Sequence, residues 1–143
     1  MGNNVLVRMH NITKKFPGVL ANDRVNFELK AGEIHALVGE NGAGKTTLMN
    51  ILYGIYQPDD GEIYIRGRRA VIKSPKEAIK LGIGMVHQHF TLISTLTVAE
   101  NIILGETSTR LIAPIRDVEN RIRRISESYG LKVNPKARIW ELS

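Results

Sequence analysis

The chain has 143 residues, of which 43% are apolar and 24% charged, and this is the composition of one ordinary globular domain. It contains no cysteine, which excludes a disulfide framework and a thiolate metal site, and we expect neither a signal peptide nor a membrane span. The net charge is +6, but the few aromatic residues do not interleave with the basic ones as a nucleic-acid platform requires, so we expect no nucleic-acid partner.

The first third of the chain has the pattern of strands and turns. Short apolar or alternating runs predict strands at residues 5–9, 25–29 and 34–38, and the last of these is apolar enough to be buried. Residues 47–53 have apolar positions at helical spacing, and Gly54 follows as a plausible C-cap.

The middle of the chain alternates between strands and a capped helix. A turn at 58–61 leads into a strand at 62–65, and 66–68 forms another turn. Ser74, Pro75 and Glu77 have the spacing of an N-cap, a first helical proline and a capping box. The helix is expected to end at Gly82, with a short strand following at 83–86.

Helices are predicted for the last third. Thr97 and Glu100 form a second capping-box pattern, which opens a helix ending at Gly105, and a loop is expected at 106–114. Residues 117–129 are amphipathic and end at Gly130. We expect the apolar face of this helix to belong to a core; it consists of Val118, Ile122, Ile125 and Tyr129.

Between the predicted strand at 34–38 and the helix at 47–53 lies Gly-Glu-Asn-Gly-Ala-Gly-Lys-Thr, residues 39–46, which matches the phosphate-binding pattern G-x-x-x-x-G-K-[ST]. Glycines let the backbone curl so that its N–H groups point at phosphate oxygens, and the helix adds its positive end. Lys45 can reach the β- and γ-phosphates, and the Thr46 hydroxyl is the expected ligand of Mg²⁺. The alternative is a glycine-rich turn before an ordinary helix, and the order of strand, loop and helix argues against it.

Four segments together resemble the nucleotide-binding subunit of an ATP-binding cassette (ABC) transporter, of the type that imports simple sugars or nucleosides. They are the phosphate loop extended to residue 48, the segment 13–19 around Phe16, the segment 85–90 around Gln88, and Leu-Thr-Val-Ala-Glu-Asn at 96–101. The resemblance implies an α/β P-loop NTPase core with an N-terminal antiparallel β-subdomain and the start of a helical subdomain, truncated. It places the β-subdomain and core at 1–87 and the Q-loop and helical subdomain at 88–143.

The resemblance also implies roles for individual residues. Phe16 would stack on adenine, Lys45 and Gln88 would be catalytic, and Thr46 and Gln88 would attend Mg²⁺. The residues expected to bind ATP along the loop are Gly39, Glu40, Asn41, Gly42, Ala43, Gly44, Lys45, Thr46 and Thr47. From the residues alone, Phe16 is as easily a core side chain, and a single Gln is usually a polar surface residue.

For the whole protein the resemblance implies ATP hydrolysis that drives uptake of a simple sugar or nucleoside. The implied partners are transmembrane permease subunits, a second cassette in a head-to-tail dimer and, indirectly, an extracytoplasmic solute-binding protein. The implied location is cytoplasmic and peripheral, at the inner face of the cell membrane. A soluble ABC-type ATPase acting on ribosomes or DNA and a non-catalytic nucleotide-binding module are the alternatives.

The chain departs from the family pattern at its end. Leu142 and Ser143 look like the first two residues of the family's signature motif. The signature glycines, the acidic strand that holds Mg²⁺, the catalytic carboxylate and the switch histidine are not found. We therefore expect a fragment that does not turn over ATP alone, and whose uncovered sheet edges favour dimerisation, swapping or poor solubility.

Two arginine clusters are not explained by the resemblance. One lies at Arg66, Arg68 and Arg69, and the other at Arg121, Arg123 and Arg124. The simplest interpretation is a charged turn and a solvated helix face. Attraction to anionic lipid near a membrane partner is the weaker alternative.

Overall fold

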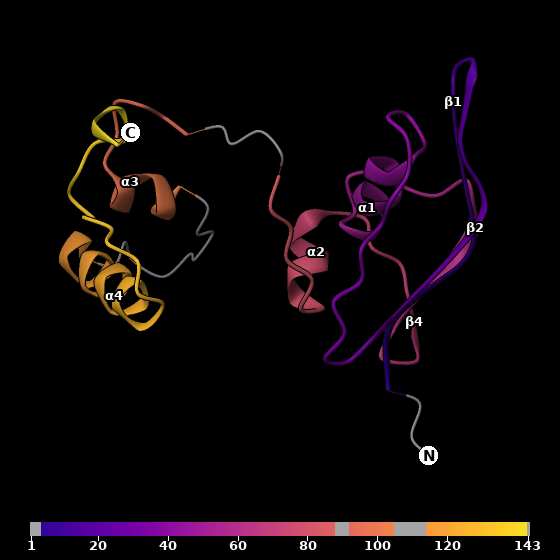
Figure 1. Cartoon of the computed structure of the whole chain (residues 1–143), viewed down its shortest axis with the longest axis horizontal. Coiled ribbons are helices and arrows are strands. Elements are labelled where there is room, and N and C mark those ends of the chain that lie inside the picture. Colours follow the sequence, from indigo (N-terminus) through magenta and orange to yellow (C-terminus); the bar gives the residue numbers. More distant parts are fainter. Residues whose placement is uncertain (1–3, 88–91, 105–113, 143) are drawn as a thin grey trace. The chain divides into compact units, whose positions relative to one another are not determined.

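The computed structural model describes residues 4–87, 92–104 and 114–142. The chain divides into two compact units, Met1–Val86 and His87–Ser143. The N-terminal unit contains a sheet and two helices, and the second unit contains the remaining helices (Figure 1). No helix among the described residues is long and apolar enough to span a bilayer.

The sheet of the first unit is antiparallel, with strand order β2-β1-β3-β4. Strands β1 (Val5–Phe16) and β2 (Val19–Lys30) form a long hairpin, and β3 (Asp60–Ile65) and β4 (Arg68–Ala70) form a short one (Figure 1). The strands predicted at 5–9, 25–29 and 62–65 are confirmed, although the first two extend further than predicted. The structure thus has the antiparallel β-subdomain that the sequence predicts.

A bulge in β1 sets which of its side chains are buried. Val7 and Met9 alternate normally toward the core, and the β1–β3 register then shifts between His10 and Thr13. At the shift Asn11 has a left-handed φ of 51°, and its N–H donates to the side-chain oxygen of Asn26 at 3.0 Å. The extra residue changes the phase of alternation, so that Ile12 is also fully buried.

Helices α1 (Lys45–Leu52) and α2 (Pro75–Lys80) pack against this sheet. Their buried side chains Leu48, Ile51 and Ala78 join the core residues of β1 and β3 in one cluster. Complete burial of a side chain such as Ile51 contributes about 1.5–3 kcal/mol. The core therefore fixes the position of α1, the helix that follows the glycine-rich loop.

Helix α2 begins as predicted, with one difference in its cap. The Ser74 hydroxyl accepts from the Glu77 N–H at 3.4 Å, and Pro75 is the first helical residue. However, the Glu77 carboxylate accepts from the N–H of Lys73 at 2.6 Å. The reciprocal bond of the capping box is thus made one residue earlier than predicted.

The two strands predicted beside the loop and after α2 are not present. Residues 34–38 and 83–86 have no regular secondary structure, and Ile34 and Val38 are 100% and 88% exposed. A buried strand needs hydrogen-bonded neighbours at its edges. None of the described strands pairs with either segment. The prediction of a buried strand at 34–38 is therefore wrong for this chain.

The second unit contains α3 (Val98–Ile103), α4 (Ile115–Ser128) and a single 3₁₀ turn, η1 (Ile139–Glu141). The capping box predicted for α3 is confirmed. The Thr97 hydroxyl accepts from the Glu100 N–H at 3.2 Å, and the Glu100 carboxylate accepts from the Thr97 N–H at 2.7 Å.

Helix α4 is confirmed, but only half of its predicted core face, Val118 and Ile122, packs in the core of the second unit. Ile122 is buried against Val98 and Ala99, whereas Ile125 and Tyr129 are 49% and 77% exposed. The two helices differ in length, since 14 residues extend over roughly 21 Å and six over roughly 9 Å. Helix α3 is thus too short to cover the whole apolar face of α4.

Candidate phosphate-binding site

The glycine-rich loop curls tightly just before α1. Gly42 and Gly44 have left-handed φ values of 86° and 82°, and the Ala43 N–H donates to the Glu40 carbonyl at 3.2 Å. An L-residue with a side chain adopts such φ values only at a cost in free energy, whereas glycine adopts them without this cost. The loop therefore reverses direction within a few residues and delivers the chain into α1 at Lys45.

The N-terminus of α1 is open to an anion. Gly44 is its N-cap and supplies no side-chain cap, and the first turn contains no acidic residue. The first N–H groups of a helix have no acceptor within the helix, and they carry a partial positive charge. With no carboxylate or hydroxyl to satisfy them, these groups form the kind of site that binds phosphate.

Lys45 is folded back over the loop. Its ammonium donates to the carbonyl oxygens of Gly39 and Glu40 at 2.6 and 2.7 Å. A lysine ammonium has three donors, so one is left for a ligand. Because both carbonyls belong to the loop, Lys45 places a positive charge beside the loop and also stabilises its conformation.

The sequence did not predict the support behind the loop. Asn22 of β2 is 5% exposed, and its side-chain N–H donates to the Gly44 carbonyl at 3.2 Å. Its oxygen, Oδ1, has no hydrogen-bond partner among the described residues. A Cβ on Gly44 would lie 2.1 Å from the Ala21 carbonyl oxygen. The only signal in the sequence is a polar residue, Asn22, three positions before the strand predicted at 25–29.

Phe16 lies at the end of β1, on the same hairpin that contacts the loop. Two residues earlier, Lys14 pairs with Asn22 across the hairpin. The Phe16 ring is half-buried and makes an edge contact with Tyr56, with ring centroids 5.3 Å apart and planes at 74°. The structure thus places an aromatic ring on the hairpin behind the loop, and Tyr56 beside it was not predicted.

Asp59 fastens the segment after α1 to the end of β1. Its carboxylate accepts from the Lys15 N–H at 2.6 Å and from the Lys14 ammonium at 3.0 Å. The hydrogen bond from the Lys15 backbone, followed by that from the Lys14 side chain, lowers the pKa of Asp59 from its ordinary value of 3.8.

This lowered pKa predicts an acid-dependent stability. A carboxylate whose pKa is lowered by folding stabilises the protein above its unfolded pKa, and loses this effect as pH falls through its folded pKa. We therefore expect Asp59→Asn to unfold with a weaker dependence on pH than the unchanged chain below about pH 4. Urea unfolding at a series of pH values measures this, and identical pH dependence in the two proteins would contradict it.

For the other predicted site residues within the described ranges, the structure gives the position and the exposure of the side chain. Thr46 is exposed at the start of α1, and Thr47 is half-buried behind it. Glu40 and Asn41 are exposed at the loop tip. Gln88 lies outside the described residues. Within the described ranges, no group of three metal-ligating side chains comes together.

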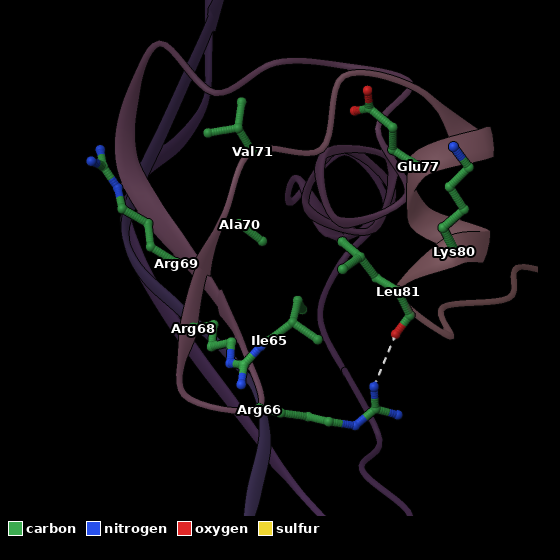
Figure 2. A pocket seen from close by; sticks show the side chains of 9 residues that line it. All are labelled: Ile65, Arg66, Arg68, Arg69, Ala70, Val71, Glu77, Lys80 and Leu81. Carbon is green, nitrogen blue, oxygen red and sulfur yellow. Dashed lines mark hydrogen bonds between the residues drawn. The ribbon is translucent and has the colours of Figure 1, made fainter.

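A separate cavity of about 630 Å³ lies between the β3–β4 hairpin and α2, with the apolar side chains of Ile65, Ala70 and Leu81 among its lining (Figure 2). Arg66 and Arg68 line the hairpin side, and Arg66 donates to the Leu81 carbonyl at 3.3 Å. Arg66 also lies in the tight turn between β3 and β4, as predicted. No residue of the 39–46 loop lines this cavity, so it is distinct from the candidate site.

Comparisons with known proteins identify the family of the chain. Residues 22–143 match the profile of the ABC transporter family, and this region contains the loop, α1 and the Asn22 contact. The chain belongs to the ABC transporter family. It is 52% identical over 139 residues to the guanosine import ATP-binding protein NupO of Bacillus subtilis, and 51% identical over 144 residues to the nucleoside import ATP-binding protein NupA of Lactococcus lactis.

These ABC relatives are much longer than the chain. The alignments cover 96% and 100% of this chain but only 27% and 28% of NupO and NupA. A ribose import ATP-binding protein of Rubrobacter xylanophilus, RbsA 1, is 50% identical over 138 residues, with 96% and 28% covered. The chain thus spans little more than a quarter of the relatives that it matches.

Solved ABC structures support the same fold. A nucleotide-free ATP-binding cassette from an ABC transporter matches with a TM-score of 0.79 and 26% identity, over 97% of this chain and 59% of that one. The ADP conformation of an ABC transporter cassette matches with a TM-score of 0.79 and 27% identity, over the same fractions. The predicted class, an ABC ATPase core with an N-terminal antiparallel β-subdomain, is confirmed.

Proposed function

We propose that the chain is the ATP-binding part of the energy-coupling subunit of an ABC importer. The observation that carries this proposal is the convergence of Lys45 and the uncapped N-terminus of α1 on one curled loop. The oxygens of a triphosphate would accept hydrogen bonds from the free donor of the Lys45 ammonium and from the N–H groups at the start of α1. The triphosphate would then be bound both by positive charge and by directed hydrogen bonds. Gly39–Thr47 would form this cradle.

The adenine base would stack on Phe16. An exposed part of an aromatic ring offers a π-face to a purine, and the hairpin that carries Phe16 is anchored to the loop through Asn22 and Gly44. The anchoring keeps the distance between the base contact and the phosphate contact constant. A ligand with both a base and a triphosphate would therefore bind better than either part alone.

Mg²⁺ would be held by the exposed hydroxyl of Thr46, at the first turn of α1, together with Gln88. The ion would supply neutralisation of phosphate charge when bound. For this chain's own residues the consequence is that Thr46 contributes one oxygen ligand, and Lys45 contributes charge from the loop side. Lys45 and Gln88 would be the groups with catalytic roles.

In the whole protein, this site would drive the import of a nucleoside or a simple sugar. The support comes from relatives whose names state import of guanosine, nucleosides and ribose. The partners would be membrane permease subunits, a second cassette arranged head to tail and an extracytoplasmic solute-binding protein, at the inner face of the cell membrane. The same relatives favour this function over a soluble ATPase acting on ribosomes or DNA. We propose that the 143-residue chain binds ATP and that turnover needs groups supplied by the remainder of the subunit.

Replacing Phe16 with Ala tests the base contact. Stacking of a base on an aromatic ring is worth about 1–3 kcal/mol, so ATP affinity should fall by roughly 5- to 150-fold. Inorganic tripolyphosphate has no base, and its affinity should not change. Isothermal titration of both ligands measures the two effects.

Equal ATP affinity in the unchanged chain and Phe16→Ala would show that the base binds elsewhere. Equal loss for ATP and tripolyphosphate would show that Phe16 supports the loop and not the base. Either result would contradict the assignment of Phe16.

A further inference from the structure

Tyr56 follows α1 and returns toward the end of β1. The helix ends at Leu52, and the Tyr56 N–H donates to the Asn50 carbonyl at 3.3 Å, which ties the tyrosine backbone to the last turn of the helix. From there its ring reaches Phe16 in an edge contact, at a centroid separation of 5.3 Å and 74° between planes. Such T-shaped pairs are favoured by about 0.5–1.5 kcal/mol beyond their area.

A second group from the β1 end restrains the same ring. The Lys14 ammonium lies 5.5 Å from the Phe16 ring centroid, within cation–π range. Its side chain is only 15% exposed, which is low for a lysine, and its ammonium is paired with the Asp59 carboxylate at 3.0 Å. The Phe16 ring therefore has an aromatic neighbour, Tyr56, and a cationic neighbour, Lys14. The segment 56–59 supplies the first and pairs with the second through Asp59.

That segment is itself attached to the backbone of β1 by two hydrogen bonds of Asp59. The Asp59 N–H donates to the Thr13 carbonyl at 2.9 Å, and the Asp59 carboxylate accepts from the Lys15 N–H at 2.6 Å. Tyr56 is thus held at both ends, by α1 before it and by β1 after it. A side chain on such a fixed segment can hold its neighbour in one orientation.

We propose that Tyr56 is a positioning residue that fixes the Phe16 ring in the orientation that accepts the base of the nucleotide. This inference rests on the proposed role of Phe16. A ring already held in place loses less conformational freedom when a base stacks on it, and the saving appears as affinity for the base. Tyr56 would affect base-containing ligands and have no effect on the triphosphate alone.

The test compares Tyr56→Ala and Tyr56→Phe in the full chain, with titrations of ATP and of inorganic tripolyphosphate. Tyr56→Ala should weaken ATP binding by about two- to tenfold and leave tripolyphosphate unchanged. Tyr56→Phe keeps the ring and should restore ATP affinity. Tyr129→Ala, which removes a tyrosine that is 77% exposed in the other unit, is the matched control and should change neither affinity.

Several results would overturn the proposal. ATP affinity unchanged in Tyr56→Ala would show that Phe16 needs no support. Equal losses for ATP and tripolyphosphate would show that Tyr56 supports the fold or the loop. If Phe16→Ala weakens ATP binding and Tyr56→Ala does not, the proposed role of Tyr56 is wrong and that of Phe16 stands. If Phe16→Ala itself has no effect on ATP, the adenine assignment fails and the role of Tyr56 fails with it.

Discussion

Replacing Lys45 with Ala is expected to reduce the affinity for ATP by roughly 100-fold or more, because the substitution removes a charged donor and two loop contacts at once. The ammonium lies 2.6 Å from the Gly39 carbonyl and 2.7 Å from the Glu40 carbonyl, so its loss also frees the loop. Tripolyphosphate should be affected as strongly as ATP, since both present the same phosphates. This pattern differs from that of Phe16→Ala, which affects ATP alone.

The matched control for this substitution is Lys80→Ala. Lys80 is exposed on α2 and lines the separate basic cavity, so its removal changes the net charge equally without touching the loop. Isothermal titration should show a large loss for Lys45→Ala and nearly unchanged binding for Lys80→Ala. Equal losses would mean that general charge, and not the loop, attracts the nucleotide.

Replacing Gly44 with Ala should damage both stability and phosphate binding. The residue has a φ of 82°, and an added Cβ would lie 2.1 Å from the Ala21 carbonyl oxygen and 2.8 Å from the Asn22 side-chain nitrogen. The left-handed conformation costs an alanine about 1–2 kcal/mol, and relief of a backbone overlap adds to this. We expect a loss of about 2–4 kcal/mol in the free energy of unfolding, with ATP binding strongly reduced because the loop is displaced from β2.

Gly42→Ala is the control for this second prediction. Gly42 has a similar φ of 86°, but an added Cβ meets nothing within 4 Å. It should therefore show only the conformational cost of about 1–2 kcal/mol. Urea unfolding measures the free energy of unfolding of both variants. The difference between them gives the effect of the close approach of Gly44 to β2, apart from the cost of the left-handed conformation. Equal destabilisation of the two variants would contradict the role of the Ala21 contact.

Features encoded by neighbouring residues could be predicted from the sequence. The α3 capping box, the N-cap at Ser74 and a turn at 66–68 depend on a few adjacent side chains. The structure confirms the first two and has the turn at 66–67, with Arg68 already in β4. The position of the glycine-rich loop before α1 is of the same kind. Such features depend little on the rest of the fold, and local patterns therefore suffice.

Features that depend on distant neighbours could not be predicted in this way. Residues 34–38 have the composition of a buried strand, but burial requires a paired neighbour, and the described strands offer none. The prediction that Tyr129, at the end of α4, belongs to a core is wrong for the same reason. A helical pattern shows which face is apolar and not whether another element covers that face.

The close packing of Gly44 on Ala21 and the contact between Tyr56 and Phe16 link residues far apart in the chain. No spacing rule in the sequence encodes either contact. The role of Phe16 in binding adenine is implied by the family resemblance, whereas its contact with Tyr56 is seen only in the structure. The candidate site thus combines a locally encoded loop with supports that only the fold reveals.

The loop before α1 is proposed to bind a nucleoside triphosphate, and an amide chemical-shift map of the chain, titrated with ATP and separately with tripolyphosphate, tests this binding site. Both ligands should shift the amides of Gly42, Gly44, Lys45 and Thr46, and only ATP should also shift those of Phe16 and Tyr56. Shifts confined to the β3–β4 hairpin and α2, around Arg66 and Lys80, with the loop amides unchanged, would show that the nucleotide does not bind at the loop.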